Sequence, residues 1–453
     1  MNLKTIHSVF FIGIGGIGMS ALARYMHLLG KKVAGYDKVN SPITRELEKQ
    51  GIGVIYTDSL EAVSSDFKTN STLVVYTPAI IIEDNKLLSY FNQTENILVK
   101  RAKLLGIITK NTISLAVAGT HGKTTTSSIL GHILKENSIP ATSFLGGIAE
   151  NYNSNLIVGG YEYSVVEADE FDRSFLELSP NFACITSMDA DHLDVYNTKE
   201  NLLEAFVEFS KKTSEKLIVK KGLPIKGTTY AVEEEADYRA HNVRINEGAF
   251  VFDVSTPEAS LNNVKIHLPG RYNIENTLAA LAMADSIGVS LNGVVRALET
   301  YKGVHRRFSF RMKTEDLVLI DDYAHHPTEI EAVYKAVREL YPNEEIVVVF
   351  QPHTFTRTRD FEMDFVKVLA QFDQVYLLPI YAAREHPIEG VSSNELVIKI
   401  RKLNPNVEII REIELVSVLH ESHKKVILML GAGDIGLMVD IVKKSFENRF
   451  WKG

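Results

Sequence analysis

The stretch "ISLAVAGTHGKTTTSSILGHILKEN", residues 113–137, is the most informative part of the sequence about the fold, because its pattern is that of a strand, a turn and a helix in that order. Its apolar run at 113–119 is typical of a buried strand, and residues 124–137 predict an amphipathic helix. A glycine turn between a strand and a helix directs backbone N–H groups and the positive helix end toward an anion. The stretch therefore predicts a phosphate-binding loop in an α/β domain.

The residue types of this loop indicate a nucleotide phosphate. Gly119 and Gly122 let the backbone approach phosphate closely. Lys123 can reach the β and γ oxygens, and the Thr124 hydroxyl can bind Mg²⁺. The spacing departs from G-x-x-x-x-G-K-[ST], because Val117 stands five positions before Gly122. An ordinary glycine turn before a helix is the alternative, but it makes no use of Gly, Lys and Thr together.

Two later strand-like runs end in acidic clusters that could hold a metal ion. The run in "YSVVEADEFDRSF" ends in Glu167, Asp169 and Glu170, and the run in "FACITSMDADHLDVY" ends in Asp189, Asp191, His192 and Asp194. Mg²⁺ prefers oxygen ligands, whereas imidazole suits other divalent ions. Acidic residues also cap helices commonly, so a capping role is the alternative to a metal site.

Composition narrows the class of protein. The chain of 453 residues alternates strand-like and helix-like periods, which predicts an α/β class with two or three domains. Its formal net charge of −8 argues against nucleic-acid binding. No apolar run approaches the roughly 20 residues that span a bilayer, and the N-terminus has no cleavable signal pattern, so we expect a cytoplasmic protein without a membrane partner. The single cysteine, Cys184, is expected to be a small buried residue.

A second glycine turn, "GIGGIG" at 13–18, follows the first strand, and Asp37 ends the next one. An acid at that distance binds the NAD ribose in dehydrogenases, so an NAD enzyme is one interpretation. The same turn accepts the diphosphate of any nucleotide diphosphate. A third turn, "GAGDIG" at 431–436, is followed by about one helix, which predicts a strand-to-helix turn instead of a second cofactor site.

In the last third of the chain, polar side chains follow two apolar strands, where open α/β sheets bind ligands. They are His325 and His326 after the first strand, and His353, Arg357 and Arg359 after the second. Arginine binds carboxylate or phosphate through a planar fork. A single histidine here would be a packing residue, but five such groups in two short turns predict a shared anion-binding crevice.

Nine motifs along essentially the whole chain resemble those of the Mur ligases in order and spacing. They are "GIGGIGMS", "AGTHGKTTT", "EADE", "DADHLD", "PGRYNIEN", "HRRF", "DDYAHHPTE", "FQPHTFTRTRD" and "GAGDIG". The resemblance, strongest to alanine-adding members, implies three domains. These are a Rossmann-like UDP-substrate domain at 1–108, a central P-loop ATPase domain at 109–303, and a Rossmann-like domain at 304–453 that closes over ATP and brings in the amino acid.

The resemblance also implies a reaction and its cofactors. With Mg²⁺, ATP phosphorylates the lactyl carboxylate of UDP-N-acetylmuramate, the L-alanine amine attacks the acyl phosphate, and phosphate leaves a tetrahedral intermediate. The product amide belongs to peptidoglycan precursor synthesis. Gly15, Gly16, Gly18 and Asp37 would then serve the UDP substrate, which argues against NAD.

The remaining site assignments also follow from the resemblance. The catalytic residues would be Lys123, Glu167, His192 and His325, and the metal ligands would be Thr124, Glu167 and His192. The ATP-binding residues would be Gly119, Thr120, His121, Gly122, Lys123, Thr124, Thr125, Asn273, Asn276 and Arg306, with Arg307 beside Arg306 at the hinge into the third domain. The amino-acid pocket would contain Tyr323, His325, His353 and Arg357.

Two departures from the family pattern concern the metal site and the amino-acid pocket. The segment "ENLLEAFVEF" lacks the modified lysine of several later-acting members, so the metal site must be completed otherwise. Thr354 stands where many alanine-adding members have arginine. The alternative within the family is a murein-tripeptide ligase acting on the same UDP-sugar, and the alternative outside it is a UDP-sugar-binding regulator with an idle ATPase fold. We expect a monomer or a homodimer.

Overall fold

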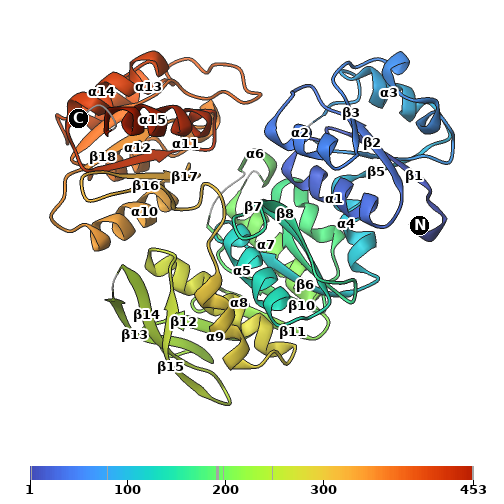
Figure 1. The fold of residues 1–453 in the computed structure, drawn as a ribbon, viewed down its shortest axis with the longest axis horizontal. Helices are drawn as coiled ribbons and strands as arrows, with labels where there is room; N and C mark the ends of the chain where they lie inside the picture. Colours follow the sequence, from blue (N-terminus) through green and yellow to red (C-terminus); the bar gives the residue numbers. More distant parts are fainter. Residues whose placement is uncertain (2, 79, 190–192, 197, 247, 451–453) are drawn as a thin grey trace. The chain divides into compact units, whose positions relative to one another are not determined.

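The computed structural model describes residues 1–450 apart from residues 2, 79, 190–192, 197 and 247. These residues form three sheets with associated helices, which confirms the α/β class (Figure 1). The chain divides into two compact units. The first contains Met1–Arg244, Val251–Ile266 and Ile274–Lys302, and the second contains Ile245–Phe250, His267–Asn273 and Gly303–Gly453. The domain limits expected after residues 108 and 303 stay predictions.

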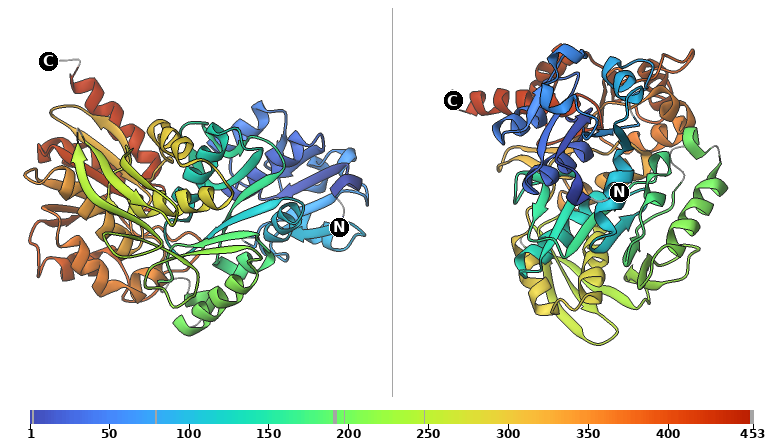
Figure 2. Two further views of the ribbon diagram at one scale, coloured as in Figure 1. Left: turned by 90° about the horizontal axis from the view of Figure 1, so that it is seen from below. Right: turned by 90° about the vertical axis from the view of Figure 1, so that its right-hand side faces the viewer.

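The first sheet is parallel, with strand order β3-β2-β1-β4-β5. Its strands are β1 (Ser8–Ile12), β2 (Lys32–Tyr36), β3 (Gly53–Ile55), β4 (Leu73–Tyr76) and β5 (Ile97–Lys100), and its helices are α1 (Ile17–Leu28), α2 (Pro42–Lys49), α3 (Lys86–Asn92) and α4 (Arg101–Thr109). Val9 and Phe11 belong to one core cluster and Phe10 and Ile12 to another, so both sheet faces are covered (Figures 1 and 2). The order reverses between β1 and β4, and such a switch point is where α/β sheets bind ligands.

The second sheet has ten strands in the order β15-β14-β13-β12-β11-β10-β6-β9-β7-β8. Its strands are β6 (Ile113–Ala118), β7 (Ala141–Ala149), β8 (Ser154–Val158), β9 (Tyr163–Ala168), β10 (Phe182–Ile185), β11 (Lys216–Lys220), β12 (Thr228–Val232), β13 (Tyr238–Asn246), β14 (Ala249–Ser255) and β15 (Ser260–Ile266). Its helices are α5 (Lys123–Glu136), α6 (Leu193–Tyr196), α7 (Lys199–Lys211), α8 (Arg271–Ser286) and α9 (Leu291–Thr300). Because β6 is parallel to its neighbours β9 and β10, these three strands end at one edge, where the loop at 119–122 begins.

Helix α5 begins directly after this loop, as predicted, but the prediction that it is amphipathic is wrong. Every residue from Thr124 to Leu134 is buried. β7, β9 and α9 all pack against the helix, so no side of this stretch faces solvent. Small polar side chains, including Ser127 and Ser128, permit this close packing without a charged face.

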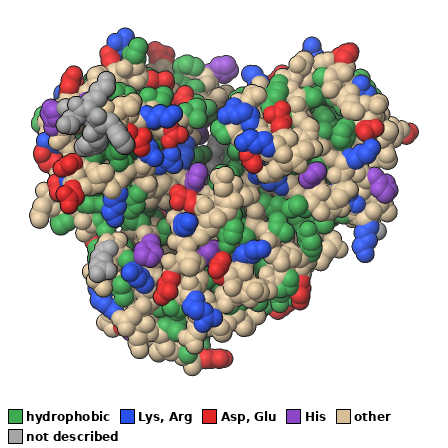
Figure 3. Space-filling model, viewed as in Figure 1, with side chains coloured by type: hydrophobic (Ala, Val, Ile, Leu, Met, Phe, Trp, Pro, Cys, Tyr) green, Lys and Arg blue, Asp and Glu red, His purple; other side chains and the backbone are tan. Residues whose placement is uncertain are grey.

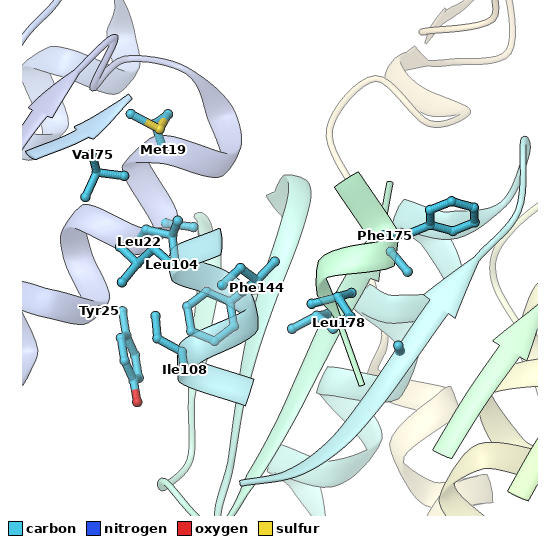
Figure 4. Packing of buried hydrophobic residues seen from close by; sticks show 14 of the residues in the cluster. Met19, Leu22, Tyr25, Val75, Leu104, Ile108, Phe144, Phe175 and Leu178 are labelled. Carbon is cyan, nitrogen blue, oxygen red and sulfur yellow. The ribbon is translucent and has the colours of Figure 1, made fainter. Parts of the chain in front are cut away.

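Helices α1 and α4 pack against strands of the second sheet in one continuous apolar core. Leu22 and Tyr25 of α1 lie in the same cluster as Ile108 of α4 and Phe144 of β7 (Figure 4). The Tyr25 and Phe144 rings meet edge-on, with centroids 5.1 Å apart. Burial of side chains of this size contributes roughly 1.5–3 kcal/mol each. The first two sheets are therefore parts of one compact unit.

A buried polar network joins α1 to β8 beside this apolar core. Asn155 of β8 is fully buried and donates to the Ile17 carbonyl at 2.5 Å and to Ser20 Oγ at 2.9 Å. Its Oδ1 accepts a hydrogen bond from Arg24, whose Nε donates to Gln50 at 3.0 Å. Burial lowers the pKa of the Arg24 guanidinium. The network therefore fixes the first turns of α1 against β8.

The second unit contains a six-stranded sheet of order β16-β17-β21-β18-β19-β20, parallel except for the β16–β17 pair. Its strands are β16 (Ser309–Lys313), β17 (Val318–Asp322), β18 (Ile346–Phe350), β19 (Gln374–Leu377), β20 (Val407–Ile409) and β21 (Val426–Leu430). Its helices are α10 (Pro327–Leu340), α11 (Phe355–Asp360), α12 (Glu362–Leu369), α13 (Ser393–Ile400), α14 (Leu415–Ser422) and α15 (Ile435–Phe450). Since β17 and β18 flank β21, the loops after them leave the same edge.

Among the described residues, no helix combines the length and the apolarity that crossing a membrane would require. On the face shown in Figure 3, Lys and Arg side chains are interspersed with Asp and Glu. Cys184 is buried within β10, as expected, and burial raises the pKa of its thiol to about 12. The thiol is therefore protonated near neutral pH.

Candidate active site

Two glycines shape the loop between β6 and α5. Gly119 has φ +136° and Gly122 has φ +84°, conformations that other residues rarely adopt. A Cβ at Gly119 would overlap the Thr186 hydroxyl, and one at Gly122 would lie 2.5 Å from Asn276 Oδ1. The loop backbone can therefore take this path only with glycine at both positions.

Residues that follow β10 hold this loop in place. Ser187 Oγ accepts a hydrogen bond from the His121 N–H at 2.7 Å, and the Thr186 hydroxyl donates to the His121 carbonyl at 2.5 Å. The Asp189 N–H donates to Thr120 Oγ1 at 3.1 Å, and the Asp189 carboxylate lies 3.4 Å from His121 Nε2. Sequence patterns identified Thr120 and His121 but missed Thr186 and Ser187, which lie 65 and 66 residues away from His121.

Lys123 is the first residue of α5, and its ammonium group is surrounded by oxygen atoms. Nζ donates to the two Glu170 carboxylate oxygens at 2.7 and 3.0 Å and to the Gly119 carbonyl at 2.6 Å. The Glu170 side chain is fully buried. Burial alone would lower the pKa of Lys123, but the nearby carboxylates, Glu170 first among them, outweigh burial and raise that pKa. Lys123 therefore stays charged beside the loop.

Glu167, the penultimate residue of β9, faces the beginning of α5. Its carboxylate accepts hydrogen bonds from Thr124 Oγ1 at 3.1 Å, Ser127 Oγ at 3.2 Å and the Gly146 N–H at 2.5 Å. Thr125, the neighbour of Thr124, is buried in the same turn. The structure thus brings together two of the three predicted metal ligands, Thr124 and Glu167, and both offer the hard oxygen atoms that Mg²⁺ prefers.

The third predicted ligand, His192, lies outside the described residues, as does Asp191. Among the described residues, no group of three or more His, Cys, Asp or Glu side chains is arranged to hold a metal ion. Completion of a metal site by His192 therefore stays a prediction.

The turn after β1 contains the glycines predicted to bind the UDP substrate. Gly15 donates its N–H to Asp37 Oδ2 at 2.7 Å, and a Cβ on Gly15 would lie 2.8 Å from that oxygen. Gly16 caps α1, and Gly18 lies in its first turn. The other Asp37 oxygen accepts the Val39 N–H at 3.0 Å. The Asp37 carboxylate therefore fixes the conformation of the turn. Asp37 lies just after β2, where the sequence analysis expected an acid that could bind a ribose.

The two asparagines predicted on the adenine side have different surroundings. Asn276 Oδ1 accepts a hydrogen bond from Thr126 Oγ1 at 3.3 Å and lies against Gly122, so the structure brings it to the loop. Asn273 belongs to the other compact unit, where its side-chain amide donates to the Pro269 carbonyl at 2.6 Å. Asn276 is thus positioned by the first unit and Asn273 by the second.

The second unit brings together the residues predicted for the amino-acid pocket. The His325 ring lies 5.3 Å from the Tyr323 ring and 5.7 Å from the His353 ring, measured between centroids. Arg357 Nη1 lies 3.3 Å from His353 Nδ1. The Tyr381 ring stacks on the His353 ring, with 5.6 Å between their centroids. Tyr381 was missed by sequence reasoning because it follows a different strand, β19.

The segments that follow β17 and β18 also contain the polar residues Thr354, His326 and Arg359. Thr354 adopts φ +67°, an uncommon conformation for a β-branched residue, and its N–H donates to the Tyr381 carbonyl at 2.9 Å. His326 caps α10, where its Nδ1 accepts the Thr328 N–H at 3.3 Å. Arg359 pairs with Asp360 on the surface. His326 and Arg359 therefore have local partners outside the His325–His353–Arg357 cluster.

Arg306 is held by residues of the second unit. Its guanidinium donates to Asp321 at 3.3 Å and to the Gly431 carbonyl, and it lies 5.2 Å from the centre of the Tyr323 ring. A Cβ on Gly436 would collide with this guanidinium. The "GAGDIG" turn, which joins β21 to α15, therefore packs around Arg306, in agreement with its interpretation as a strand-to-helix turn.

Comparisons with known proteins identify the class. Models of the Mur ligase family catalytic domain, the Mur ligase middle domain and the Mur ligase glutamate ligase domain match residues 8–112, 117–284 and 306–438. The chain belongs to the Mur ligase family, and its three-domain Mur ligase architecture is confirmed.

Individual relatives narrow the comparison within this family. The UDP-N-acetylmuramate–L-alanine ligase of Flavobacterium psychrophilum is 52% identical over 451 residues, which cover 99% of this chain and 100% of the relative. The crystal structure of the UDP-N-acetylmuramate–alanine ligase of Thermotoga maritima matches with a TM-score of 0.84 and 29% identity over 98% of this chain and 99% of that one. A murein peptide ligase of Psychrobacter arcticus shares the fold, with a TM-score of 0.70 and 21% identity over 98% and 99% of the two chains.

Proposed function

We infer that this chain is an ATP-dependent ligase that joins L-alanine to the lactyl carboxylate of UDP-N-acetylmuramate in peptidoglycan precursor synthesis. The observation that carries this conclusion is the 52% identity to an alanine-adding ligase along 99% of the chain. The murein peptide ligase, at 21% identity, resembles it in fold alone. The reaction runs in the cytoplasm, where both ATP and nucleotide sugars are made.

The first chemical step needs charge neutralisation more than covalent catalysis. A carboxylate is a poor acyl donor, so its oxygen attacks the γ-phosphorus of ATP, ADP leaves, and an acyl phosphate results. Lys123 is the first residue of α5, and the N-terminal end of a helix favours a bound anion. We assign Lys123 to the transferred phosphoryl group, whose charge it would stabilise.

Mg²⁺ would be held by Thr124 and Glu167, with His192 as the third protein ligand. The Thr124 hydroxyl and the Glu167 carboxylate are already in contact at 3.1 Å. When bound, the ion neutralises charge on the β and γ phosphates. The Gly119–Thr125 loop and Asn276 would hold the phosphates of ATP, and Asn273 and Arg306 keep the ATP-binding roles that their motifs imply.

This metal assignment has a direct test. Glu167→Gln keeps the size of the side chain but removes a negative oxygen ligand, so half-maximal ligation should need several-fold more Mg²⁺. A Mg²⁺ titration of the ligation rate in wild type and variant measures the change, and UDP-N-acetylmuramate binding should be retained. An unchanged titration would mean that Glu167 only caps α5.

The second step uses the pocket in the second unit. The Arg357 guanidinium would bind the carboxylate of L-alanine, because arginine holds planar anions through two hydrogen bonds. A proton on His325 Nδ1 can be donated to the Tyr323 carbonyl, 3.0 Å away, which leaves Nε2 as a base for the alanine ammonium. The free amine then attacks the acyl carbon, and the tetrahedral intermediate expels phosphate.

An amide-formation assay with a panel of amino acids and UDP-sugars tests this function. We expect ATP-dependent coupling of L-alanine to UDP-N-acetylmuramate, with much slower coupling of the murein tripeptide. Faster coupling of the tripeptide would favour the murein-tripeptide ligase, and nucleotide-sugar binding without any coupling would favour a regulator. Sedimentation of the purified protein distinguishes the monomer from the homodimer.

A further inference from the structure

Arg101 lies between the two phosphate-binding turns of the first unit, although neither turn contains it. It is the first residue of α4, directly after β5 ends at the ligand edge of the first sheet. Its Nη2 donates to Asp169 Oδ2 at 3.2 Å, and 23% of its side chain is exposed. Asp169 stands between Glu167 and Glu170, so one end of the guanidinium reaches the acidic cluster beside Lys123.

The other end of the guanidinium lies over the first turn of α1. A Cβ on Gly18 would be 2.7 Å from Arg101 Nη1 and 3.2 Å from its Cδ. Glycine at position 18 therefore leaves the space that the arginine occupies. This first turn contains Gly18 and follows Gly15 and Gly16, the three glycines assigned to the UDP substrate.

A small pocket lies beside the guanidinium on its Asp169 side. Its lining contains Arg101, Glu167, Asp169, Ser174, Phe175 and Leu178. The pocket thus has one basic group, two acidic groups and an apolar wall. Among the described residues, Arg101 donates a side-chain hydrogen bond to Asp169 alone. Because an arginine has five N–H donors, others remain for an anion at the α1 turn.

We propose that Arg101 binds the diphosphate of the UDP substrate and that Asp169 is a positioning residue that orients its guanidinium. This deepens the proposed function and rests on it. Arginine suits the role because its rigid planar fork presents two parallel N–H donors to two phosphate oxygens, a fixed geometry that the flexible lysine side chain lacks. The contact would place the UDP-sugar against the acidic cluster of the ATP site, so that its carboxylate approaches the γ-phosphate.

The same helix offers a matched ion pair with no such surroundings. Lys103 Nζ lies 3.1 Å from Glu177, and both side chains are about half exposed. Arg101 and Lys103 thus pair with neighbouring segments of the same region, but the phosphate-binding glycine turn lies beside Arg101. Lys103→Ala is therefore the control for losing an ion pair of α4.

Calorimetric titration with UDP-N-acetylmuramate and with UDP alone, in the absence of ATP, tests the proposal. Arg101→Ala should raise the dissociation constant of both ligands by about 10- to 100-fold, the range for a lost hydrogen bond to a charged group. Arg101→Lys should give a smaller rise, and Lys103→Ala should stay within about twofold of wild type. Unchanged UDP affinity in Arg101→Ala would overturn the diphosphate contact, and equal losses in Arg101→Ala and Lys103→Ala would reduce it to an ordinary ion pair.

The role of Asp169 needs a separate measurement. Asp169→Asn should raise the KM for UDP-N-acetylmuramate several-fold more than the KM for ATP, and it should add little in the Arg101→Ala background. Full additivity of the two changes would overturn the positioning role. If wild type couples L-alanine to UDP-N-acetylmuramate while Arg101→Ala binds UDP normally, only this inference fails; if wild type forms no amide, the proposed function fails.

Discussion

Removing Lys123 should have two separable consequences at the scale of one residue, because its ammonium pairs with the fully buried Glu170 carboxylate. Lys123→Ala should lower the ligation rate on the order of 10²- to 10³-fold through the lost phosphate contact. It should also destabilise the fold by about 3 kcal/mol, because it leaves a buried charge without its partner. From the sequence we predicted only the catalytic and ATP-binding roles of this lysine, because its buried partner cannot be recognised without the fold.

A second substitution separates the two effects. Glu170→Gln in the Lys123→Ala background removes the uncompensated charge, so most of the lost stability should return while ligation stays as slow as in Lys123→Ala. Urea unfolding measures the stability of each variant. Recovery of ligation in the double variant would contradict the role of Lys123, and a stable Lys123→Ala single variant would contradict the importance of the buried pair.

Asp322, at the end of β17, should make the free energy of unfolding depend on pH. Burial raises its pKa to about 6, although Arg307 and the N–H groups of Phe308 and Ala324, at 2.6 and 2.7 Å, favour the charged form. Because the folded pKa lies above the unfolded value, stability from the protonated form is present below about pH 4 and is lost as pH rises through about 6.

Asp322→Asn removes this titration. Between pH 5 and 7.5, wild type should lose on the order of 1 kcal/mol of unfolding free energy relative to the variant. The measurement is urea unfolding of both proteins at both pH values. The asparagine oxygen can accept only one of the two N–H groups, which lowers the stability of the variant at every pH. The test is therefore the change with pH in the stability difference between the two proteins. A constant difference across this range would contradict the raised pKa.

At the scale of elements, the contact between α1 and β8 depends on one buried side chain. Asn155→Ala leaves the buried Arg24 guanidinium without this acceptor, which should cost about 1–3 kcal/mol. Gln50→Ala removes the other acceptor of Arg24, but Gln50 is exposed and water can replace it, so its cost should be much smaller. Urea unfolding and amide exchange in α1 measure both, and equal losses would contradict the network's role.

Local patterns predicted where elements begin better than how they are buried. Gly122 and Lys123 mark the start of α5 because a left-handed glycine precedes the first helical turn. The burial of Ser127 and Ser128 could not be predicted, since it depends on strands and a helix distant in sequence. The order of strands in the sheet also depends on contacts between residues distant in sequence. Ala118 pairs with both Ala168 and Ile185, and no local pattern specifies that pairing.

Across the molecule, motifs predicted functional residue types but not most of their partners. Lys123 and Thr124 were identifiable as candidates because they follow a glycine turn between a strand and a helix, and Glu167 because it belongs to an acidic cluster at the end of a later strand. Glu170 was noted only as one acid of a cluster, and its pairing with Lys123 spans 47 residues. Arg101 lies outside every motif, and its contact with Asp169 spans 68 residues. Such long-range contacts need the fold before they can be recognised.

The proposed ATP site and the proposed UDP-substrate site lie in different parts of the chain, so we expect ATP cleavage to depend on the second substrate. ATP cleavage should be slow without UDP-N-acetylmuramate, since phosphoryl transfer needs its acceptor in line. With this sugar nucleotide but no L-alanine, reversible acyl phosphate formation should move an ¹⁸O label from the β,γ-bridge of ATP into nonbridging β positions, because the β-phosphate of bound ADP can rotate before back-transfer. L-Alanine should convert this exchange into net ADP, phosphate and amide. Lys123→Ala should show neither process, whereas scrambling without the UDP-sugar, or ATP hydrolysis indifferent to both substrates, would exclude an acyl phosphate route.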